Sequence, residues 1–255
     1  MNPNSQKSAK GRRRRQRHGF SLIELLVVIA ILMILAMITL PVIKMLGEKR
    51  QEVACADNLR KLGFATSLYI TDHNGILETF QGGNVSQNMW STELLRGGYI
   101  DPTLPTGTSQ ELMTTFINSS MARLFRCPMG KVPPSYNLPA NWGLWLWATY
   151  GMAMYAPEGA IGKSALDPTG QTKSYKVRVS NVSFPGKFIL LADSANNATE
   201  CYQTFRIYSS SAGGFALRHR NRANAVFLDG HLESLTRDDL VRLGVSAGMI
   251  YKADR

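Results

Sequence analysis

Residues 19–40 of this 255-residue chain read GFSLIELLVVIAILMILAMITL, and this stretch decides the fold of the N-terminal part. From Phe20 onward the run contains only one serine, one glutamate and one threonine, so it is apolar on every face of a helix. About 20 such residues, at about 1.5 Å each, span the roughly 30 Å hydrocarbon core of a bilayer. Because helices buried in soluble proteins rarely stay apolar all round, the run predicts a membrane-spanning helix.

The segment before the run, residues 1–19, is strongly basic and contains no acidic residue. It supplies seven of the chain's +11 net charges, from Lys7, Lys10, Arg12, Arg13, Arg14, Arg15 and Arg17. Cations beside a membrane span favour the cytoplasmic side. We therefore expect one pass through the inner membrane, with the N-terminus in the cytoplasm and the head in the periplasm or outside the cell. A basic tail can also bind nucleic acid, but the adjacent apolar helix favours membrane lipid, so we expect no nucleic-acid partner.

Two residues of this stretch are unusual for a simple membrane anchor. Gly19 stands at the boundary between the basic tail and the apolar run, and Glu24 lies inside the run. A carboxylate within a membrane helix costs on the order of a few kcal/mol, so such an acid indicates a function. An ordinary secretory signal carries its small-residue cleavage site after the apolar region, and this sequence has no convincing site there.

The helix is expected to continue beyond the membrane, although Pro41 should kink or loosen it. Apolar and small residues then recur at helical spacing between charged residues, which predicts an amphipathic helix packed on a head domain. These residues are Cys55, Leu59, Leu62, Thr66 and Tyr69. The predicted organisation is a leader at 1–19, a membrane span at 20–43, an exported amphipathic half-helix at 44–73, and a globular head at 74–255.

The head has short apolar runs separated by Gly, Pro, Ser and Asn, a pattern typical of strands. The predicted strand segments are 144–155, 175–182, 187–194, 204–210 and 223–235, the last folded as a hairpin at Asp229-Gly230. Short helices are predicted at 92–95, 111–125 and 236–243, with Thr236 capping the last of these. A long N-terminal helix packed on an antiparallel sheet is an α+β fold.

The sequence Gly19-Phe20-Ser21-Leu22-Ile23-Glu24 resembles the type IV prepilin family, which includes the pseudopilins of type II secretion. The resemblance implies that prepilin peptidase cuts between Gly19 and Phe20 and then N-methylates Phe20. It implies that Glu24 neutralises the Phe20 ammonium of a neighbouring subunit during assembly. Pro41 matches a family position at which the helix melts as the filament forms.

The head resembles a pseudopilin-like group at several further points. These are the helix segment 55–63, Cys127-Pro128, Tyr150-Gly151-Met152, and His219 placed nine residues before Asp229-Gly230 in the region 219–230. The resemblance assigns no chemistry to the His-x9-Asp-Gly motif.

These features lead us to expect a pilin-like structural subunit of a membrane-anchored filament, and among such subunits we favour a type II secretion pseudopilin. The implied partners are prepilin peptidase/methyltransferase, copies of itself or other pseudopilins, the inner-membrane assembly platform, and membrane lipid. The alternative is a monomeric membrane-tethered binding protein that uses the prepilin export route. We expect no cofactor and no enzymatic activity, because no Gly-x-Ser-x-Gly nucleophile motif is present.

Several polar residues of the head invite a functional interpretation. Export to an oxidising compartment favours a disulfide between Cys55 and Cys127, leaving Cys201 unpaired. A weak candidate metal set is formed by His219, Asp229, His231 and Asp193. We favour structural roles for this set, with Asp229-Gly230 as a turn and His219 hydrogen-bonded to a loop. The basic cluster at 218–222 is expected to be a solvated face or an inter-subunit salt bridge.

Overall fold

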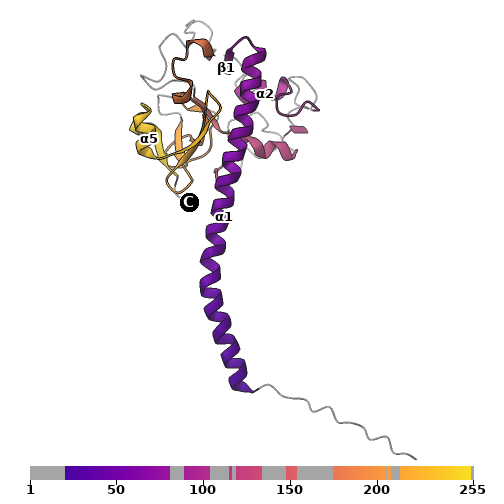
Figure 1. The fold of residues 1–255 in the computed structure, drawn as a ribbon, viewed down its shortest axis with the longest axis vertical. Coiled ribbons are helices and arrows are strands. Elements are labelled where there is room, and N and C mark those ends of the chain that lie inside the picture. Colours follow the sequence, from indigo (N-terminus) through magenta and orange to yellow (C-terminus); the bar gives the residue numbers. More distant parts are fainter. Residues whose placement is uncertain are drawn as a thin grey trace, which may run out of the picture. The chain divides into compact units, whose positions relative to one another are not determined.

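The structure is a computed structural model that describes residues 21–80, 89–103, 115–116, 119–133, 148–153, 175–204, 206–207 and 213–253. Gly19 and Phe20 therefore lie outside the described residues. The chain divides into two compact units, Met1–Leu46 and Gly47–Arg255. A long N-terminal helix followed by β-sheets confirms the predicted α+β fold (Figure 1).

Helix α1 covers Leu22–Asp72 and continues through Pro41 without a break in its secondary structure. Because a helix can bend at a proline without being interrupted, the kink at Pro41 stays a prediction. The side chains before Gly47 are exposed at nearly every position. Among the described residues, α1 is the one helix long and apolar enough to cross a membrane, which is consistent with a membrane anchor.

The predicted stripe on the second half of α1 is confirmed. Each of its members, Cys55, Leu59, Leu62, Thr66 and Tyr69, is buried. The helix ends at Asp72, where Asn74 and Gly75 adopt positive φ angles of 53° and 74°. A glycine in the left-handed region commonly follows a helix, because it allows the last turn to close without a Cβ clash. The amide of Gly75 donates to the carbonyl of Ile70 at 2.9 Å.

The described residues of the head form three sheets with antiparallel and parallel pairing. The largest has the order β6-β2-β4-β8-β9, a second has the order β10-β7-β5, and β1 pairs with β3. Most strand pairs are antiparallel, as predicted, and the pairs β2–β6 and β7–β10 are parallel, so the sheets that contain them are mixed. The strands are β1 (Ile76–Phe80), β2 (Gly151–Ala153), β3 (Tyr175–Arg178), β4 (Ile189–Ala192), β5 (Ser194–Ala195), β6 (Arg206–Ile207), β7 (Gly214–Leu217), β8 (Ala223–Phe227), β9 (Leu232–Leu235) and β10 (Ile250–Lys252).

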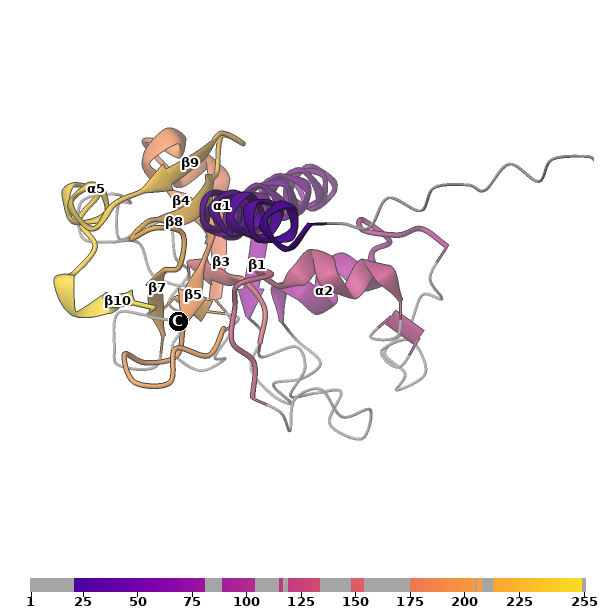
Figure 2. The ribbon, with the colours of Figure 1, turned by 90° about the horizontal axis from the view of Figure 1, so that it is seen from below.

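From Gly47 onward, α1 lies between the largest sheet and helix α2 (Trp90–Arg96), as Figure 2 shows in a view along the helix. Strand β8 is buried on both faces. Val226 faces the core shared with α1 and α2, whereas Ala225 and Phe227 face a second core. That second core is closed by Leu240 of helix α5 (Arg237–Arg242). The five-stranded sheet thus has a hydrophobic core on each side.

The short helices match the sequence in part. The predicted helix at 92–95 lies within α2, and Thr236 caps α5 as predicted. Of the helix predicted at 111–125, the described residues 115–116 are α-helical and Ser120–Phe125 form the 3-10 helix η1, with a bend at Ser119 between them. Three further 3-10 helices are η5 (Val179–Asn181), η6 (Pro185–Lys187) and η7 (Ala247–Met249).

Candidate functional site

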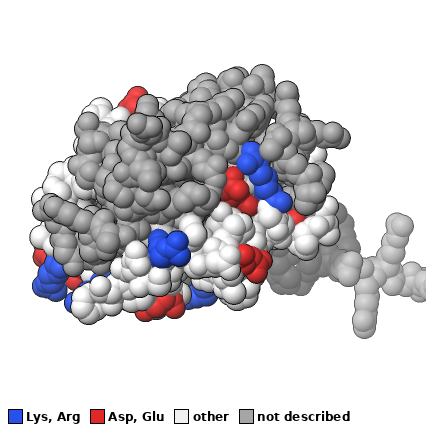
Figure 3. Space-filling view, turned by 90° about the horizontal axis from the view of Figure 1, so that it is seen from above, with Lys and Arg blue, Asp and Glu red and all other residues white. Residues whose placement is uncertain are grey.

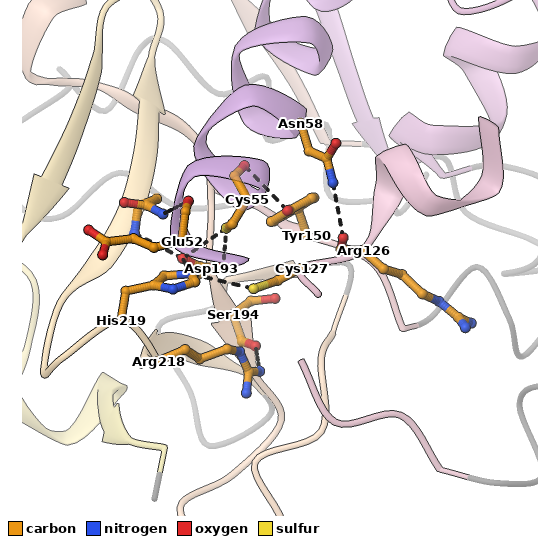
Figure 4. Close-up of polar contacts among 11 residues, drawn as sticks. Glu52, Cys55, Asn58, Arg126, Cys127, Tyr150, Asp193, Ser194, Arg218 and His219 are labelled. Carbon is orange, nitrogen blue, oxygen red and sulfur yellow. Dashed lines mark hydrogen bonds and ion pairs between the residues drawn. The ribbon is translucent and has the colours of Figure 1, made fainter. Parts of the chain in front are cut away.

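Four side chains from distant parts of the sequence meet in the interior of the head (Figure 4). They are Cys55, Cys127, Asp193 and His219. One donor atom of each, a sulfur, a ring nitrogen or a carboxylate oxygen, lies within 4.8 Å of the other three. Each of the four residues is at most 2% exposed. The arrangement is a buried, compact cluster of groups that can bind a cation.

Asp193 and His219 lie where the chain passes between two sheets. Asp193 separates β4 of the five-stranded sheet from β5 of the three-stranded sheet. Its own amide donates to the carbonyl of Asn224 at 3.0 Å, and the Asn224 amide donates back to Asp193 Oδ2 at 2.9 Å. These bonds fix both the backbone and the carboxylate of Asp193 against β8.

His219 begins the tight turn that returns the chain from β7 to β8. Backbone hydrogen bonds of 3.0 and 3.1 Å join His219 and Arg222 in both directions. Between them Arg220 and Asn221 have φ angles of 53° and 61°. Two successive left-handed residues are typical of a two-residue hairpin turn of type I′. This turn holds the imidazole at the sheet junction, beside Asp193.

Cys55 and Cys127 come from the opposite side, from α1 and from the segment after η1. The side-chain amide of Asn58, one helical turn after Cys55, donates to the carbonyls of Arg123 and Arg126 at 3.1 and 3.2 Å. The hydroxyl of Tyr150 donates to the carbonyl of Cys55 at 3.4 Å. These bonds join the Cys127 segment to α1 and bring the two cysteines into one cluster.

The contacts within the cluster are short. The Cys55 thiol donates to Asp193 Oδ1 at 3.2 Å, and its sulfur lies 3.5 Å from Oδ2. His219 Nε2 lies 3.1 Å from Asp193 Oδ2 and 3.4 Å from Cys127 Sγ. A ring nitrogen offers a single in-plane N–H or lone pair. Asp193 Oδ2 and Cys127 Sγ therefore compete for the one direction in which His219 Nε2 can bond.

Burial and the neighbouring groups together set the pKa values of the two thiols. Burial raises the pKa of Cys55 well above its usual value, and the neighbouring Cys127 and Asp193 add to the rise. Burial also acts to raise the pKa of Cys127, but the hydrogen bonds with Cys55 and His219 outweigh it and lower that pKa. Because Cys127 lies beside the imidazole of His219 whereas Cys55 lies beside the carboxylate of Asp193, Cys127 is the better source of a thiolate.

Asp193 and His219 form a buried ion pair. Burial acts to raise the pKa of Asp193, but the hydrogen bond from His219 outweighs it and holds that pKa below its usual value. Burial acts to lower the pKa of His219, but the contacts with Asp193 and Cys127 raise it to about 10. The side chain of His219 thus pairs with a carboxylate, which corrects the predicted hydrogen bond from this histidine to a loop.

Arg218 places a further positive charge beside the cluster. Its guanidinium donates to the carbonyl of Cys201 at 3.1 Å and to the carbonyl of Ser194. The residue is 5% exposed, and its charge contributes to lowering the pKa of Asp193.

The basic cluster at 218–222 is therefore not the uniformly solvated face that the sequence suggested. Arg218 and His219 are buried, and Arg220 and Arg222 are exposed, because the tight turn directs the first two toward the sheet junction. On the face of the molecule drawn in Figure 3, the described basic and acidic side chains are interspersed.

The two ends of the His-x9-Asp-Gly motif lie apart, at opposite ends of strand β8. His219 joins the buried cluster, whereas Asp229 pairs with His231, whose Nδ1 lies 2.6 Å from Asp229 Oδ1. Both members of this second pair are exposed. Gly230 has a φ of 91° in the turn between β8 and β9, which agrees with the predicted hairpin. The weak metal set proposed from the sequence thus divides into two pairs.

The predicted Cys55–Cys127 disulfide remains a prediction. All three cysteines are free thiols in the structure, and Cys201 lies in a different hydrophobic cluster. Sequence analysis paired the two cysteines with each other and grouped Asp193 and His219 with surface residues. The signal that could have joined three of the four was that Cys55, Cys127 and His219 each belong to a separate motif-like segment.

At the start of α1, Glu24 accepts a hydrogen bond from the amide of Ser21 at 2.8 Å. A carboxylate in this position satisfies one of the amides that a helix N-terminus leaves without an intrahelical partner. Glu24 therefore stabilises the first turn of the helix, directly after the predicted cleavage site.

Comparison with known families identifies the same region. Residues 14–40 match the family described as the prokaryotic N-terminal methylation motif. No curated protein and no solved structure matches the chain. The match includes the last six residues of the basic leader, the Gly19–Phe20 junction and the apolar run. It supports a type IV pilin-like protein that is processed by prepilin peptidase.

Proposed function

We propose that this protein is a structural subunit of a membrane-anchored filament, and specifically a type II secretion pseudopilin. The observation that carries the proposal is the match of residues 14–40 to the methylation motif at the point where an apolar helix begins. In this function the protein is a building block and not an enzyme. Its partners are prepilin peptidase, copies of itself or other pseudopilins, and the inner-membrane assembly platform.

Assembly is proposed to depend on a charge pair within the membrane. Cleavage after Gly19 creates an ammonium group at Phe20, and Glu24 lies four residues further along the chain. Each charge alone is costly in a bilayer, and pairing between neighbouring subunits removes most of that cost. The apolar side chains of α1 before Gly47, which are exposed, supply the surface along which helices of neighbouring subunits pack.

Substitution of Glu24 tests this function. Glu24→Leu removes both the charge and the acceptor for the Ser21 amide, whereas Glu24→Gln removes the charge and keeps an acceptor. Both variants should be inserted and processed normally. Both should lose assembly, because an unpaired buried charge costs on the order of 3–5 kcal/mol, or about two or more decades of association.

The measurement is chemical crosslinking of membranes from the native host at equal expression of wild type and variants. A ladder of multimers in wild type that is absent in both variants supports the filament subunit. Assembly retained by Glu24→Gln but lost in Glu24→Leu would assign Glu24 to capping its own helix. Equal ladders in all three would favour the membrane-tethered binding protein.

A further inference from the structure

The spacing of the buried cluster agrees with that of four ligands around one metal ion. With zinc bonds of about 2.3 Å to sulfur and about 2.0–2.2 Å to nitrogen and oxygen, tetrahedral angles place neighbouring donors roughly 3.4–3.8 Å apart. Three contacts between donors of different residues measure 3.1, 3.2 and 3.4 Å, and all four donor atoms lie within 4.8 Å of one another. The donors in these three contacts would have to separate by a few tenths of an ångström, and donors that lie up to 4.8 Å apart would have to approach by at most about 1 Å, to enclose an ion.

The kinds of donor atom select the ion. Two sulfurs and an imidazole suit zinc and related transition-metal ions, whereas calcium and magnesium require shells of oxygen atoms. Iron–sulfur clusters are generally held by four cysteine thiolates, and this cluster has two cysteines. We propose that Cys55, Cys127, Asp193 and His219 bind one zinc ion as a tetrahedral structural site.

The local charge is balanced when zinc is bound. Two thiolates and one carboxylate carry three negative charges, and neutral imidazole carries none. Zinc leaves a net charge of about −1, which the buried guanidinium of Arg218 neutralises. Arg218 is held at this place by the carbonyls of Ser194 and Cys201. Without a metal, the two thiols bring no charge to balance Arg218.

The position of the site indicates what the ion does. All four ligands are buried, so the site is closed, as structural zinc sites are, and leaves no coordination position for a substrate. Cys55 belongs to α1, Cys127 follows η1, and the other two ligands mark the junction between the sheets. One ion at this point would join the exported half of the anchor helix to the rest of the head.

A zinc site and a disulfide exclude each other, because both use the sulfurs of Cys55 and Cys127. The first experiment therefore uses the full wild-type chain, purified in detergent from cells supplied with zinc. Elemental analysis should find one zinc per chain, and X-ray absorption should show two sulfur and two nitrogen or oxygen neighbours. This measurement needs no variant, so it does not depend on whether a substituted protein folds.

Matched substitutions locate the ion. Cys127→Ser and His219→Gln should each weaken zinc retention by at least about tenfold, since even loss of an outer-shell partner costs about 10–100-fold in affinity. Cys201→Ser and His231→Gln change the same residue types outside the cluster and should retain zinc at the wild-type level. Cobalt added to the metal-stripped wild-type chain should give a thiolate-to-metal charge-transfer band.

Three results would overturn the proposal. One is a chain isolated without zinc, whether its thiols are free or peptide mapping shows a Cys55–Cys127 disulfide. Another is a zinc shell made only of oxygen and nitrogen. The third is zinc that remains at full occupancy in both Cys127→Ser and His219→Gln.

Discussion

Gly63 lies at a close contact between α1 and strand β8. A Cβ atom built at this position would lie 2.8 Å from a methyl carbon of Val226, closer than such atoms pack. Gly63→Ala should therefore destabilise the head. Overpacking costs about 1–3 kcal/mol, and the gain in helix propensity returns at most about 1 kcal/mol. Urea unfolding followed by tryptophan fluorescence would measure the change.

Gly47 provides the matched control, because it is also an interior glycine of α1 and its Cβ would meet no atom within 4 Å. Gly47→Ala should leave the stability of the head unchanged or raise it slightly. If both variants have the same stability, Gly63 is not required for close packing of α1 on the sheet.

At the scale of single residues, the sequence showed which side chains are important, but it did not show which of them lie next to each other. Local motifs singled out Cys55, Cys127 and His219, and Asp193 was named only as a member of the weak candidate metal set. These four side chains meet because the chain crosses between the two sheets twice, from β4 to β5 and from β7 to β8. Both crossings depend on pairing between strands that are distant in the sequence. A pattern within one segment carries no information about which distant segment packs against it, so the sequence could not pair His219 with Asp193.

At the scale of elements, strong periodicity was a reliable guide. The stripe on α1 repeats over four turns, and every predicted member is buried. Each predicted strand segment contains a strand, but β1, β5, β7 and β10 were missed. Of these, β5, β7 and β10 are two to four residues long, too short for alternation to emerge. These segments are strands because they pair with segments distant in the sequence, and local propensity does not encode that pairing.

Helix α5 allows a test of a predicted capping signal. The Thr236 hydroxyl accepts from the Asp239 amide at 3.2 Å, and the Asp239 carboxylate accepts from the Thr236 amide at 2.9 Å. Thr236→Ala removes the first of these bonds and should destabilise the head by about 0.5–2 kcal/mol. Thermal unfolding monitored by circular dichroism would detect the loss.

Ser246 serves as the control for this substitution, because it occupies the N-cap position of η7 and makes no side-chain capping bond. Ser246→Ala should therefore unfold like the wild type. An unchanged melting curve for Thr236→Ala would mean that packing of Leu240 alone holds α5 on the sheet.

At the scale of the whole molecule, charge and hydrophobicity are divided sharply along the chain. Seven cations precede the apolar run, and the head carries charges of both signs. Hydropathy and charge bias are properties of long segments, so this organisation could be predicted from the sequence without knowledge of any contact. The head, by contrast, needed the structure, because its polar residues acquire their roles only through packing.

The predicted cleavage site follows from this division, because Gly19 stands where the basic leader meets the apolar run. The mature protein should begin at Phe20 and carry one additional methyl group on its terminal amine. Mass spectrometry of N-terminal peptides from membrane fractions would show this. Gly19→Ala should leave the full-length chain in the membrane, since insertion depends on the apolar run and not on the junction. Gly11→Ala, a glycine within the leader, should be cut normally. A mature chain that keeps Arg12–Arg17, or one cut near Ala36, would instead indicate a signal anchor or an ordinary secretory signal.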